Sequence, residues 1–531
     1  MVGFFELKDR DPRVRATDLY IYSMLFIFPL FTGFWGYNRV TDSKFAFFAA
    51  ATLAWLTAIL ALSRGRRNLL SFRRAPAAEK FVLLYLALCV VSTLFSPYRV
   101  QALIGAGRYD GLLTTALCCA AFLGAGHYAR PKAGYVYAAA LAGSLNCAVA
   151  LLQLSGFNPL WLFPDDCNFY DAGVRFSSVF LGTIGNADLF AAYLCLILPL
   201  TGVYYITAER RPLPLLAAFG LSALCLLASG VSGGMLALAV FLVCTLPFLI
   251  GSGERLRRML ELAAVLFLAA FFSFPLHVST PQGGGAVRIA GHFSALSPAV
   301  LTAAAAAVLL RFMTAKKEFR SRHLKRIFAA FSLACVAGSC ALVYFWSGTD
   351  GTLYELSQVL HGHLEDRFGS SRILIWRKVL ALFPAHPLLG GGPGTLPLRL
   401  DLQFTRHVAE TGGTITTYVD NAHNVYLGIL VNTGIFSLAA CLGAALFTLR
   451  GALRAQKSSF AAPLACALLC FWVQDFFDLG LFIVTPMMWI LWGLLTGDGQ
   501  RERERHAKSA CILSRISRLP APRFSDPSKR P

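Results

Sequence analysis

The feature that most constrains this chain is a series of long apolar runs, each followed by a short polar segment. A membrane helix needs about 20 predominantly apolar residues to cross the hydrocarbon core. The number of predicted membrane helices depends most on how residues 178–206 and 278–312 are divided. The runs therefore predict an all-α polytopic membrane protein with about 12–14 transmembrane helices. The fourteen runs are 17–36, 45–62, 81–97, 112–129, 133–155, 186–207, 213–230, 233–251, 259–277, 294–312, 327–346, 423–446, 460–477 and 480–497.

Composition agrees with a membrane protein, and the positions of the charges give an orientation. Only 14% of the 531 residues are charged, compared with about a quarter in a soluble domain. The net charge of +20 would by itself suggest a nucleic-acid binder. However, 36 of the 48 Lys and Arg residues fall in segments on the side of the N-terminus and 12 on the other side. Cytoplasmic loops retain Lys and Arg, so we expect cytoplasmic termini, contact with membrane lipid and no nucleic-acid partner.

The same pattern divides the chain into four parts. Residues 1–346 are predicted to form an N-terminal bundle of about eleven helices. Residues 347–422 are a long extracytoplasmic loop with short helices, and 423–497 are the C-terminal transmembrane helices. Residues 498–531 are basic and polar, which predicts a disordered cytoplasmic tail.

The long loop is the main polar segment of the chain, and it holds six of the twelve cations outside: Arg367, Arg372, Arg377, Lys378, Arg399 and Arg406. Two interpretations stay open, which are ion pairs with neighbouring acids or a shared anionic ligand. Residues 372–383 have amphipathic helical spacing, into which Ile375 fits least well, and predict an interfacial helix that carries Trp376. The glycines at 390–394 lack the Lys-Ser/Thr of a nucleotide-binding loop, so they predict a turn or hinge.

Five short motifs lie in the long loop, at its end and in earlier connections. The most specific is His423-Asn424, followed after nine residues by Gly434 and then by Ser437. The others are Ser-Arg-Ile-x-x-Trp at 371–376, His-Pro-Leu-Leu-Gly-Gly-Gly at 386–392, Gly-Arg-Tyr-Asp-Gly at 107–111 and Gly-Thr-Ile-Gly-Asn at 182–186. Together these motifs resemble the O-antigen ligase and polymerase family, and two positions depart from the family pattern. Ser437 replaces Gly, Thr or Tyr, and Ser-Gly-Gly at 232–234 replaces a frequent Ser-Arg-Gly.

The resemblance implies a metal-independent, inverting glycosyltransferase that needs no cofactor. It would move a glycan from an undecaprenyl-diphosphate carrier to an acceptor hydroxyl on the outer face of the bacterial cytoplasmic membrane. Histidine suits removal of the acceptor's proton, which makes His423 the candidate base. Arginine binds phosphate oxygens with two parallel hydrogen bonds, and Arg372 is the first candidate. The other expected substrate-binding residues are Arg108, Arg175, Arg288, Asn424, Asp420 and Trp376.

Structural alternatives remain open for several of these residues. Asn421 or Asn424 is expected to cap the following helix, and Asp420 either orients His423 or caps the helix. His361, His363 and His386 lack matching carboxylates, so they are interpreted as surface histidines and not as metal ligands. The remaining polar residues near membrane segments are either functional or structural: Asn186, Asp188, Gln474, Asp475 and Asp478.

The acceptor and the exact reaction are also open. A glycan, a lipid or a protein acceptor would correspond to a polymerase, a ligase or a protein O-oligosaccharyltransferase. A glycan flippase or solute transporter is the alternative from a different class. Transporters place key charges near the membrane midplane and often have repeated halves. This chain gathers its polar residues in one outer loop and shows no convincing repeat, which favours the enzyme.

Overall fold

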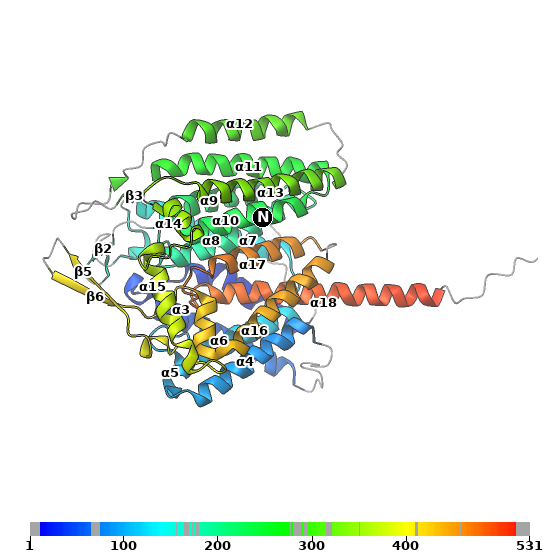
Figure 1. Ribbon diagram of the computed structural model, residues 1–531. Coiled ribbons are helices and arrows are strands. Elements are labelled where there is room, and N and C mark those ends of the chain that lie inside the picture. Colours follow the sequence, from blue (N-terminus) through cyan, green and yellow to red (C-terminus); the bar gives the residue numbers. More distant parts are fainter. Residues whose placement is uncertain are drawn as a thin grey trace, which may run out of the picture.

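The computed structural model is a bundle of helices with small β-hairpins (Figure 1). It describes residues 11–64, 75–154, 157–163, 169–171, 174–176, 180–276, 278–279, 288–289, 296–314, 321–349, 351–408, 413–455 and 458–516. The first helices are α1 (Pro12–Tyr22), α2 (Phe28–Leu30), α3 (Val40–Leu62), α4 (Ala77–Phe95), α5 (Arg99–Ile104), α6 (Leu112–Tyr128) and α7 (Ala133–Leu154). The middle helices are α8 (Ala187–Thr207), α9 (Leu213–Ser229), α10 (Ser232–Leu249), α11 (Gly253–Ser273), α12 (Ser297–Met313) and α13 (Ser321–Tyr344). The last are α14 (Gly351–Leu360), α15 (Phe368–Ala381), α16 (Val425–Arg454), α17 (Ala461–Gln474) and α18 (Thr485–Ile516).

The predicted all-α polytopic membrane fold is confirmed, and each of the fourteen apolar runs is occupied mainly by helix. Within the described ranges, seven helices are long and apolar enough to cross a membrane. Five further apolar helices are shorter, namely α6, α9, α12, α17 and the first part of α10. The first run is divided into α1, a π-helical turn at Ser23–Ile27 and α2, where Pro29 lies.

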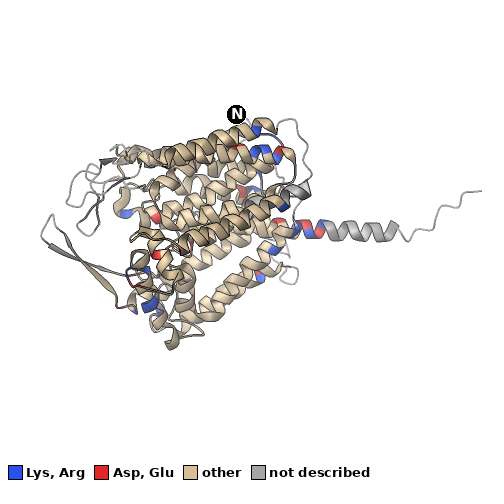
Figure 2. Cartoon of the chain, turned by 45° about the horizontal axis from the view of Figure 1, so that its top comes forward, with Lys and Arg blue, Asp and Glu red and all other residues tan. Residues whose placement is uncertain are grey.

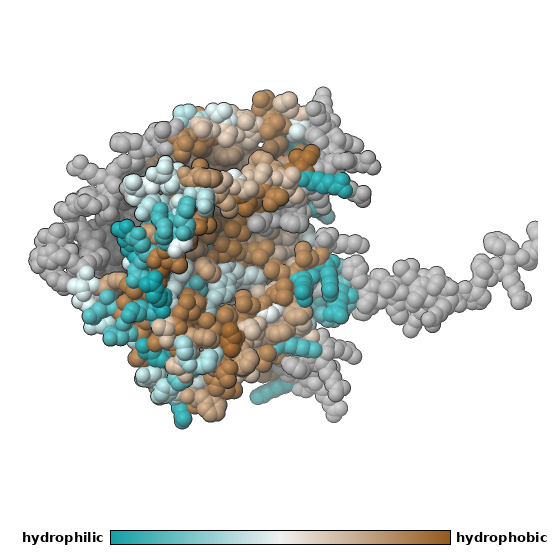
Figure 3. Space-filling view, in the orientation of Figure 1, coloured by the Kyte–Doolittle hydropathy of each residue, from teal (hydrophilic) through white to brown (hydrophobic). Residues whose placement is uncertain are grey.

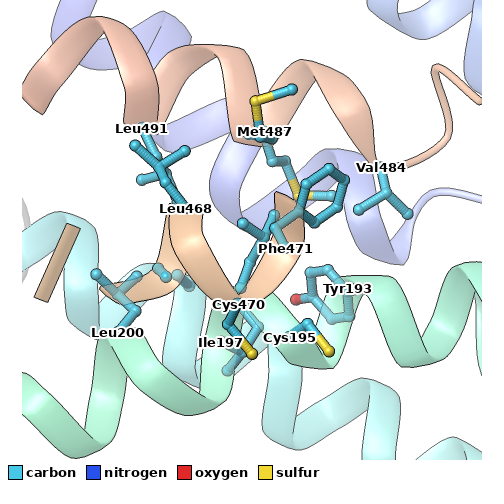
Figure 4. Close-up of a cluster of buried hydrophobic side chains, with 14 of the residues drawn as sticks. Tyr193, Cys195, Ile197, Leu200, Leu468, Cys470, Phe471, Val484, Met487 and Leu491 are labelled. Carbon is cyan, nitrogen blue, oxygen red and sulfur yellow. The ribbon is translucent and has the colours of Figure 1, made fainter. Parts of the chain in front are cut away.

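Helix α8 forms the centre of the bundle, and almost all of its residues are buried. Helix α17 packs against α8, and α18 packs against α17 and α6. Figure 4 shows Phe471 of α17 between Tyr193 of α8 and Met487 of α18. Helix α13 differs, because its side chains from 326 onward are mostly exposed, as expected for a helix that faces lipid.

The two ends of the bundle are polar and the middle is apolar. Strands β5 (Gln403–Val408) and β6 (Gly413–Tyr418) form an antiparallel hairpin that projects from one end, which we call the hairpin end (Figure 1). Helix α18 extends from the opposite end. Charged residues gather toward these two ends (Figure 2), and apolar side chains cover much of the surface between them (Figure 3). This distribution is expected when lipid surrounds the middle of the bundle. The short strand pairs are β1 (Phe169–Asp171) with β2 (Val174–Phe176), and β3 (Val278–Ser279) with β4 (Arg288–Ile289).

Helix α18 continues to Ile516, so residues 498–516 are helical although we predicted a disordered tail from 498. Side-chain pairs one helical turn apart stabilise the first part of this extension. Arg505 pairs with Glu502 at 2.5 Å, and Gln500 donates to Glu504 at 2.9 Å. Such pairs stabilise an exposed helix by a few tenths of a kcal/mol each. The rest of the predicted tail, 517–531, lies outside the described residues.

Candidate active site

His423 lies in the connection that leads into α16 and has an unusual backbone conformation. Its φ is +48°, in the left-handed region, which non-glycine residues seldom adopt and which is frequent at functional sites. The His423 N–H donates to Asn421 Oδ1 at 2.9 Å, and Asn421 Nδ2 donates to the Leu479 carbonyl at 3.0 Å. Asn421 therefore connects His423 to the segment between α17 and α18.

Asn424 is the N-cap of α16, which confirms the capping alternative for this residue. Its Oδ1 accepts a hydrogen bond from the Leu427 N–H at 3.0 Å. The side chain is buried, and its carbonyl oxygen is already used by the helix. Asp420 does not cap α16, because that position belongs to Asn424.

Four charged side chains act on the imidazole of His423. Burial lowers the pKa of His423 most, and the nearby guanidinium of Arg372 lowers it further. Asp188 opposes these effects, while Arg108 again lowers the pKa and Asp420 raises it. The imidazole is consequently neutral at pH 7 and has a free lone pair for a proton. The fold thus brings Arg372, Arg108 and Asp420 close to His423, as the sequence predicts, and adds Asp188 from the first turn of α8.

Arg372 lies on α15, and only some of the N–H donors of its guanidinium have hydrogen-bond acceptors nearby. Its Nη2 is 3.7 Å from Asp188 and donates to the Phe477 carbonyl at 3.3 Å. Its Nη1 has a long contact of 3.5 Å to the Gly369 carbonyl. Its Nε is buried without a hydrogen-bond partner in the described part of the chain. A buried guanidinium donor without a partner is costly unless a ligand or water satisfies it.

Arg108 forms an ion pair with Asp420, with 2.5 Å between Nε and Oδ2. Arg108, which the resemblance assigns to substrate binding, thus has an acidic partner, and Asp420 has a direct partner. Both side chains are about one-third exposed, so the pair stays accessible at the hairpin end.

The other predicted arginines are not located by the structure. Arg175 belongs to β2 and Arg288 to β4, but their side chains lie outside the described residues. Their assignment to substrate binding therefore stays a prediction.

Helix α15 is present, but its apolar face differs from the prediction. Residues 369–371 have left-handed backbones, so regular helix begins only at Arg372. Ile375, which fitted the predicted apolar face least well, is 4% exposed. The spacing of residues 372–383 does not show this burial, because α15 packs into a small second core with Leu396, Leu400 and Val431.

Trp376 also faces the protein. Its ring packs edge-to-face on Phe476, with ring centres 5.5 Å apart, and lies near Phe477. Its Nε1 is buried and has no hydrogen-bond partner among the residues described. Trp376 thus packs on Phe476 and Phe477, and the carbonyl of Phe477 also accepts a hydrogen bond from Arg372.

Polar groups at the end of α17 are buried in the same region. Gln474, Asp475 and Asp478 are each at most 4% exposed. Both amide atoms of Gln474 and one oxygen of each acid lack partners in the described ranges. Burial raises the pKa of Asp478 to about 7, and the charge of Asp188 also raises it. Buried polar atoms without partners are costly to stability, which favours the functional interpretation that the sequence left open.

The departure from the family pattern at Gly233 has a structural counterpart. A Cβ atom at Gly233 in α10 would lie 2.6 Å from Gln474 Oε1 and 3.0 Å from Phe477 Cβ. Gln474 and Phe477 therefore fill the space into which a side chain at this position would extend.

Three histidines and two arginines of the long loop have surface roles. His361, His363 and His386 are exposed, as predicted. Arg367 pairs with Glu365 at 2.6 Å, and Arg377 pairs with Asp366 at 2.7 Å. Within the described ranges, no three His, Cys, Asp or Glu residues are grouped as metal ligands.

A cavity of about 260 Å³ lies behind the connection that carries His423. Its lining includes Asp110, Asp420 and Asn424, together with the aromatic rings of Trp472 and Trp489. Neither His423 nor Arg372 lines it. The charged cluster around His423 and this partly apolar cavity are therefore separate features that share the connection 420–425.

Comparison with known proteins identifies this region. Residues 286–442 match the family model described as O-antigen ligase, so the resemblance seen in the motifs is confirmed for this part of the chain. No curated protein matches the chain. The family match supports a role in membrane glycan transfer during polysaccharide assembly.

Proposed function

We propose that this protein, which matches the O-antigen ligase family over residues 286–442, transfers a glycan from undecaprenyl diphosphate to an acceptor hydroxyl. The observation that carries the proposal is the partly satisfied guanidinium of Arg372 beside the neutral imidazole of His423. One group is suited to the phosphates of the donor, and the other to the proton of the acceptor.

The orientation follows from the distribution of Lys and Arg. The end opposite the hairpins carries the basic segment of α18, with Arg501, Arg503 and Arg505. Because cytoplasmic segments retain Lys and Arg, we place this end in the cytoplasm. The hairpin end, with His423 and Arg372, then lies at the outer face of the bacterial cytoplasmic membrane, where a lipid-linked diphosphate is accessible.

In the proposed reaction, His423 removes the proton of the acceptor hydroxyl as its oxygen attacks C1 of the donor sugar. The bond between C1 and the phosphate oxygen breaks, and undecaprenyl diphosphate leaves with the electron pair. Attack opposite to the leaving group inverts the configuration at C1. Arg372 stabilises the charge that develops on the diphosphate. Guanidinium groups can neutralise this charge, so we propose transfer without a metal ion, and the diphosphate linkage supplies the energy.

A transfer assay in vesicles tests the proposal. We expect purified protein to move glycan from an undecaprenyl-diphosphate-linked oligosaccharide to an acceptor and to release undecaprenyl diphosphate. Parallel reactions with a lipid, a glycan and a protein acceptor distinguish ligase, polymerase and oligosaccharyltransferase. Movement of the intact lipid-linked glycan across the vesicle bilayer, without release of the carrier, would support the flippase alternative and contradict the proposal.

Asp188 offers a test of the electrostatics around the base. Asp188 raises the pKa of His423, so Asp188→Asn removes a negative charge that favours the imidazolium. We expect the acid limb of the pH profile of kcat/KM, which reports the free enzyme's base, to move to lower pH. Asp366→Asn is the matched control, since Asp366 pairs with Arg377 on the surface. An unchanged limb in Asp188→Asn would argue against His423 as the titrating group.

A further inference from the structure

We propose that Arg399 is a positioning residue that places His423 by holding the far end of a short half-helix. The inference rests on the proposed function, because it assumes that His423 is the base. Arg399 is one of the outer cations for which the sequence left two interpretations open. The structure shows a third use of its charge, which begins with a break in α16.

Helix α16 is interrupted at Gly434. The φ and ψ of Gly434 are 85° and 173°, a combination that is essentially restricted to glycine. In a continuous helix, the N–H of residue 435 would donate to the carbonyl of residue 431. Here the Ile435 N–H donates to the Pro387 carbonyl at 3.0 Å instead. Residues 425–433 therefore form a separate half-helix, and His423 lies just before its first turn.

The loop around residues 387–392 supplies partners for the free carbonyls of the half-helix. Gly391 N–H donates to the Val431 carbonyl at 3.1 Å, and Gly392 N–H donates to the Asn432 carbonyl at 2.8 Å. Ser92 of α4 adds a hydrogen bond of 3.2 Å to the same Asn432 carbonyl. The glycine segment, predicted as a turn or hinge, thus makes backbone hydrogen bonds with the helix break.

This contact requires a very close approach of two backbones. A Cβ atom at Gly434 would lie 2.0 Å from the Leu388 carbonyl oxygen. A Cβ atom at Gly390 would lie 2.3 Å from the Asn432 carbonyl carbon. Backbone atoms cannot move aside as a flexible side chain can, so both positions need glycine.

Arg399 completes the end of the half-helix. Its Nη2 donates to Asn432 Oδ1 at 2.5 Å, and its Nη1 donates to the Val431 carbonyl at 3.3 Å. Its Nε donates to Thr395 Oγ1 at 3.2 Å. All three contacts are to neutral groups, whereas Arg377 pairs with Asp366 on the surface. A cation is favourable at the carbonyl end of a helix, where the helix dipole is negative.

A small tilt of the half-helix at this end displaces His423 at the other end by a distance that matters for catalysis. At about 1.5 Å per residue, the half-helix is about 13 Å long, so a tilt of about 5° displaces its other end by about 1 Å. A misplacement of about 1 Å is enough to cost about 10²-fold in rate. The start of the half-helix is held by the Val425 N–H, which donates to the Asp475 carbonyl at 2.9 Å. Arg399 provides the corresponding support at the other end.

Arg399→Gln tests the inference, because it removes the charge and the forked donor but keeps a polar side chain. We expect kcat for transfer from an undecaprenyl-diphosphate-linked oligosaccharide to fall by about 10- to 10²-fold, with the donor KM little changed. Arg377→Gln, from the surface of the same loop, is the matched control and should keep the wild-type kcat. Rates are expressed per folded molecule, determined from the monodisperse fraction.

A double-mutant cycle separates positioning from other roles. Asn432→Ala removes the Oδ1 acceptor while the carbonyl contacts remain, and we expect a smaller fall in kcat. Combined with Arg399→Gln, the two effects on kcat should be clearly less than multiplicative, because both variants break the same contact. A raised donor KM with unchanged kcat would instead indicate that Arg399 binds the donor and would overturn the inference. Unchanged kcat per folded molecule would overturn it too.

The same series distinguishes this inference from the proposed function. If His423→Asn abolishes transfer while Arg399→Gln transfers normally, only the positioning role is wrong. If His423→Asn transfers normally, the assignment of the base is wrong, and the positioning role is wrong with it.

Discussion

Replacement of His423 is expected to reduce glycan transfer by at least about 10²-fold, within the range of about 10² to 10⁴ for loss of a general base. The expectation follows from the environment of the imidazole. Burial and the cation of Arg372 lower its pKa, so the unprotonated form that accepts a proton predominates at pH 7. Initial rates of transfer from a lipid-linked oligosaccharide measure the effect directly.

The backbone of His423 decides which substitution is most informative. At a φ of +48°, any residue with a Cβ atom carries a strain of about 1–2 kcal/mol. Histidine, like asparagine, occurs more often than alanine in left-handed backbones, so His423→Ala combines loss of the base with lower stability. Asparagine tolerates left-handed backbones better than other non-glycine residues and has no basic group. We therefore expect His423→Asn to fold normally and to lose transfer as fully as His423→Ala.

The control for this prediction is His386→Ala, because His386 is an exposed histidine of the same loop. It should transfer glycan at the wild-type rate. Near-normal transfer by His423→Asn, with His386→Ala also active, would remove His423 as the general base.

The sequence predicts the helices well because the membrane imposes a simple rule. Spanning segments must be long, apolar and helical, and each of the fourteen apolar runs is occupied mainly by helix. The rule fails where other forces act. Helix α18 continues past 497 because its polar side chains pair along an exposed helix. Ile375 is buried because α15 packs on a local core, which periodicity alone does not show.

The candidate site is only partly predictable, because it joins residues that are far apart in the chain. The motif identifies His423 and Arg372, and the fold brings the imidazole and the guanidinium near each other. Asp188 comes from the first turn of α8, and no spacing in the sequence connects it to the loop. The role of Asn421 depends on a carbonyl at Leu479. A backbone carbonyl is present in every residue, so the sequence does not show which carbonyl accepts such a hydrogen bond.

The break in α16 shows a further limit of sequence patterns. In the sequence, Gly434 is only one position of the family motif, within a single apolar run. Its positive φ and its contact with Leu388 become apparent only when the glycine segment at 390–394 is placed beside it. Both glycine positions and Arg399 then have one physical explanation, since all three serve the same junction.

Replacement of Arg372 is the second substitution for which we expect a large effect. Loss of one charged or hydrogen-bonding group at a developing anion costs about 10²–10³ in rate, and we expect a fall of this size in kcat/KM for Arg372→Gln. Arg372→Lys keeps the charge but loses the planar fork, so it should be impaired less. Arg377→Gln is the control, because Arg377 pairs with Asp366 on the surface. Full activity of both Arg372 variants would show that Arg372 is only an ion-pair partner of Asp188.

The pH profile of Arg372→Gln provides an independent check on the geometry, because it reports on His423 and not on the donor. The guanidinium lowers the pKa of His423, since a nearby cation disfavours the imidazolium. Without that cation the pKa rises, and the acid limb of kcat/KM should move to higher pH, opposite to the shift expected for Asp188→Asn. Arg372→Lys keeps the cation and should leave the limb near its wild-type position. Opposite shifts of the acid limb in Arg372→Gln and Asp188→Asn would show that both residues act on one titrating imidazole. If both variants instead keep the wild-type profile, the base lies elsewhere.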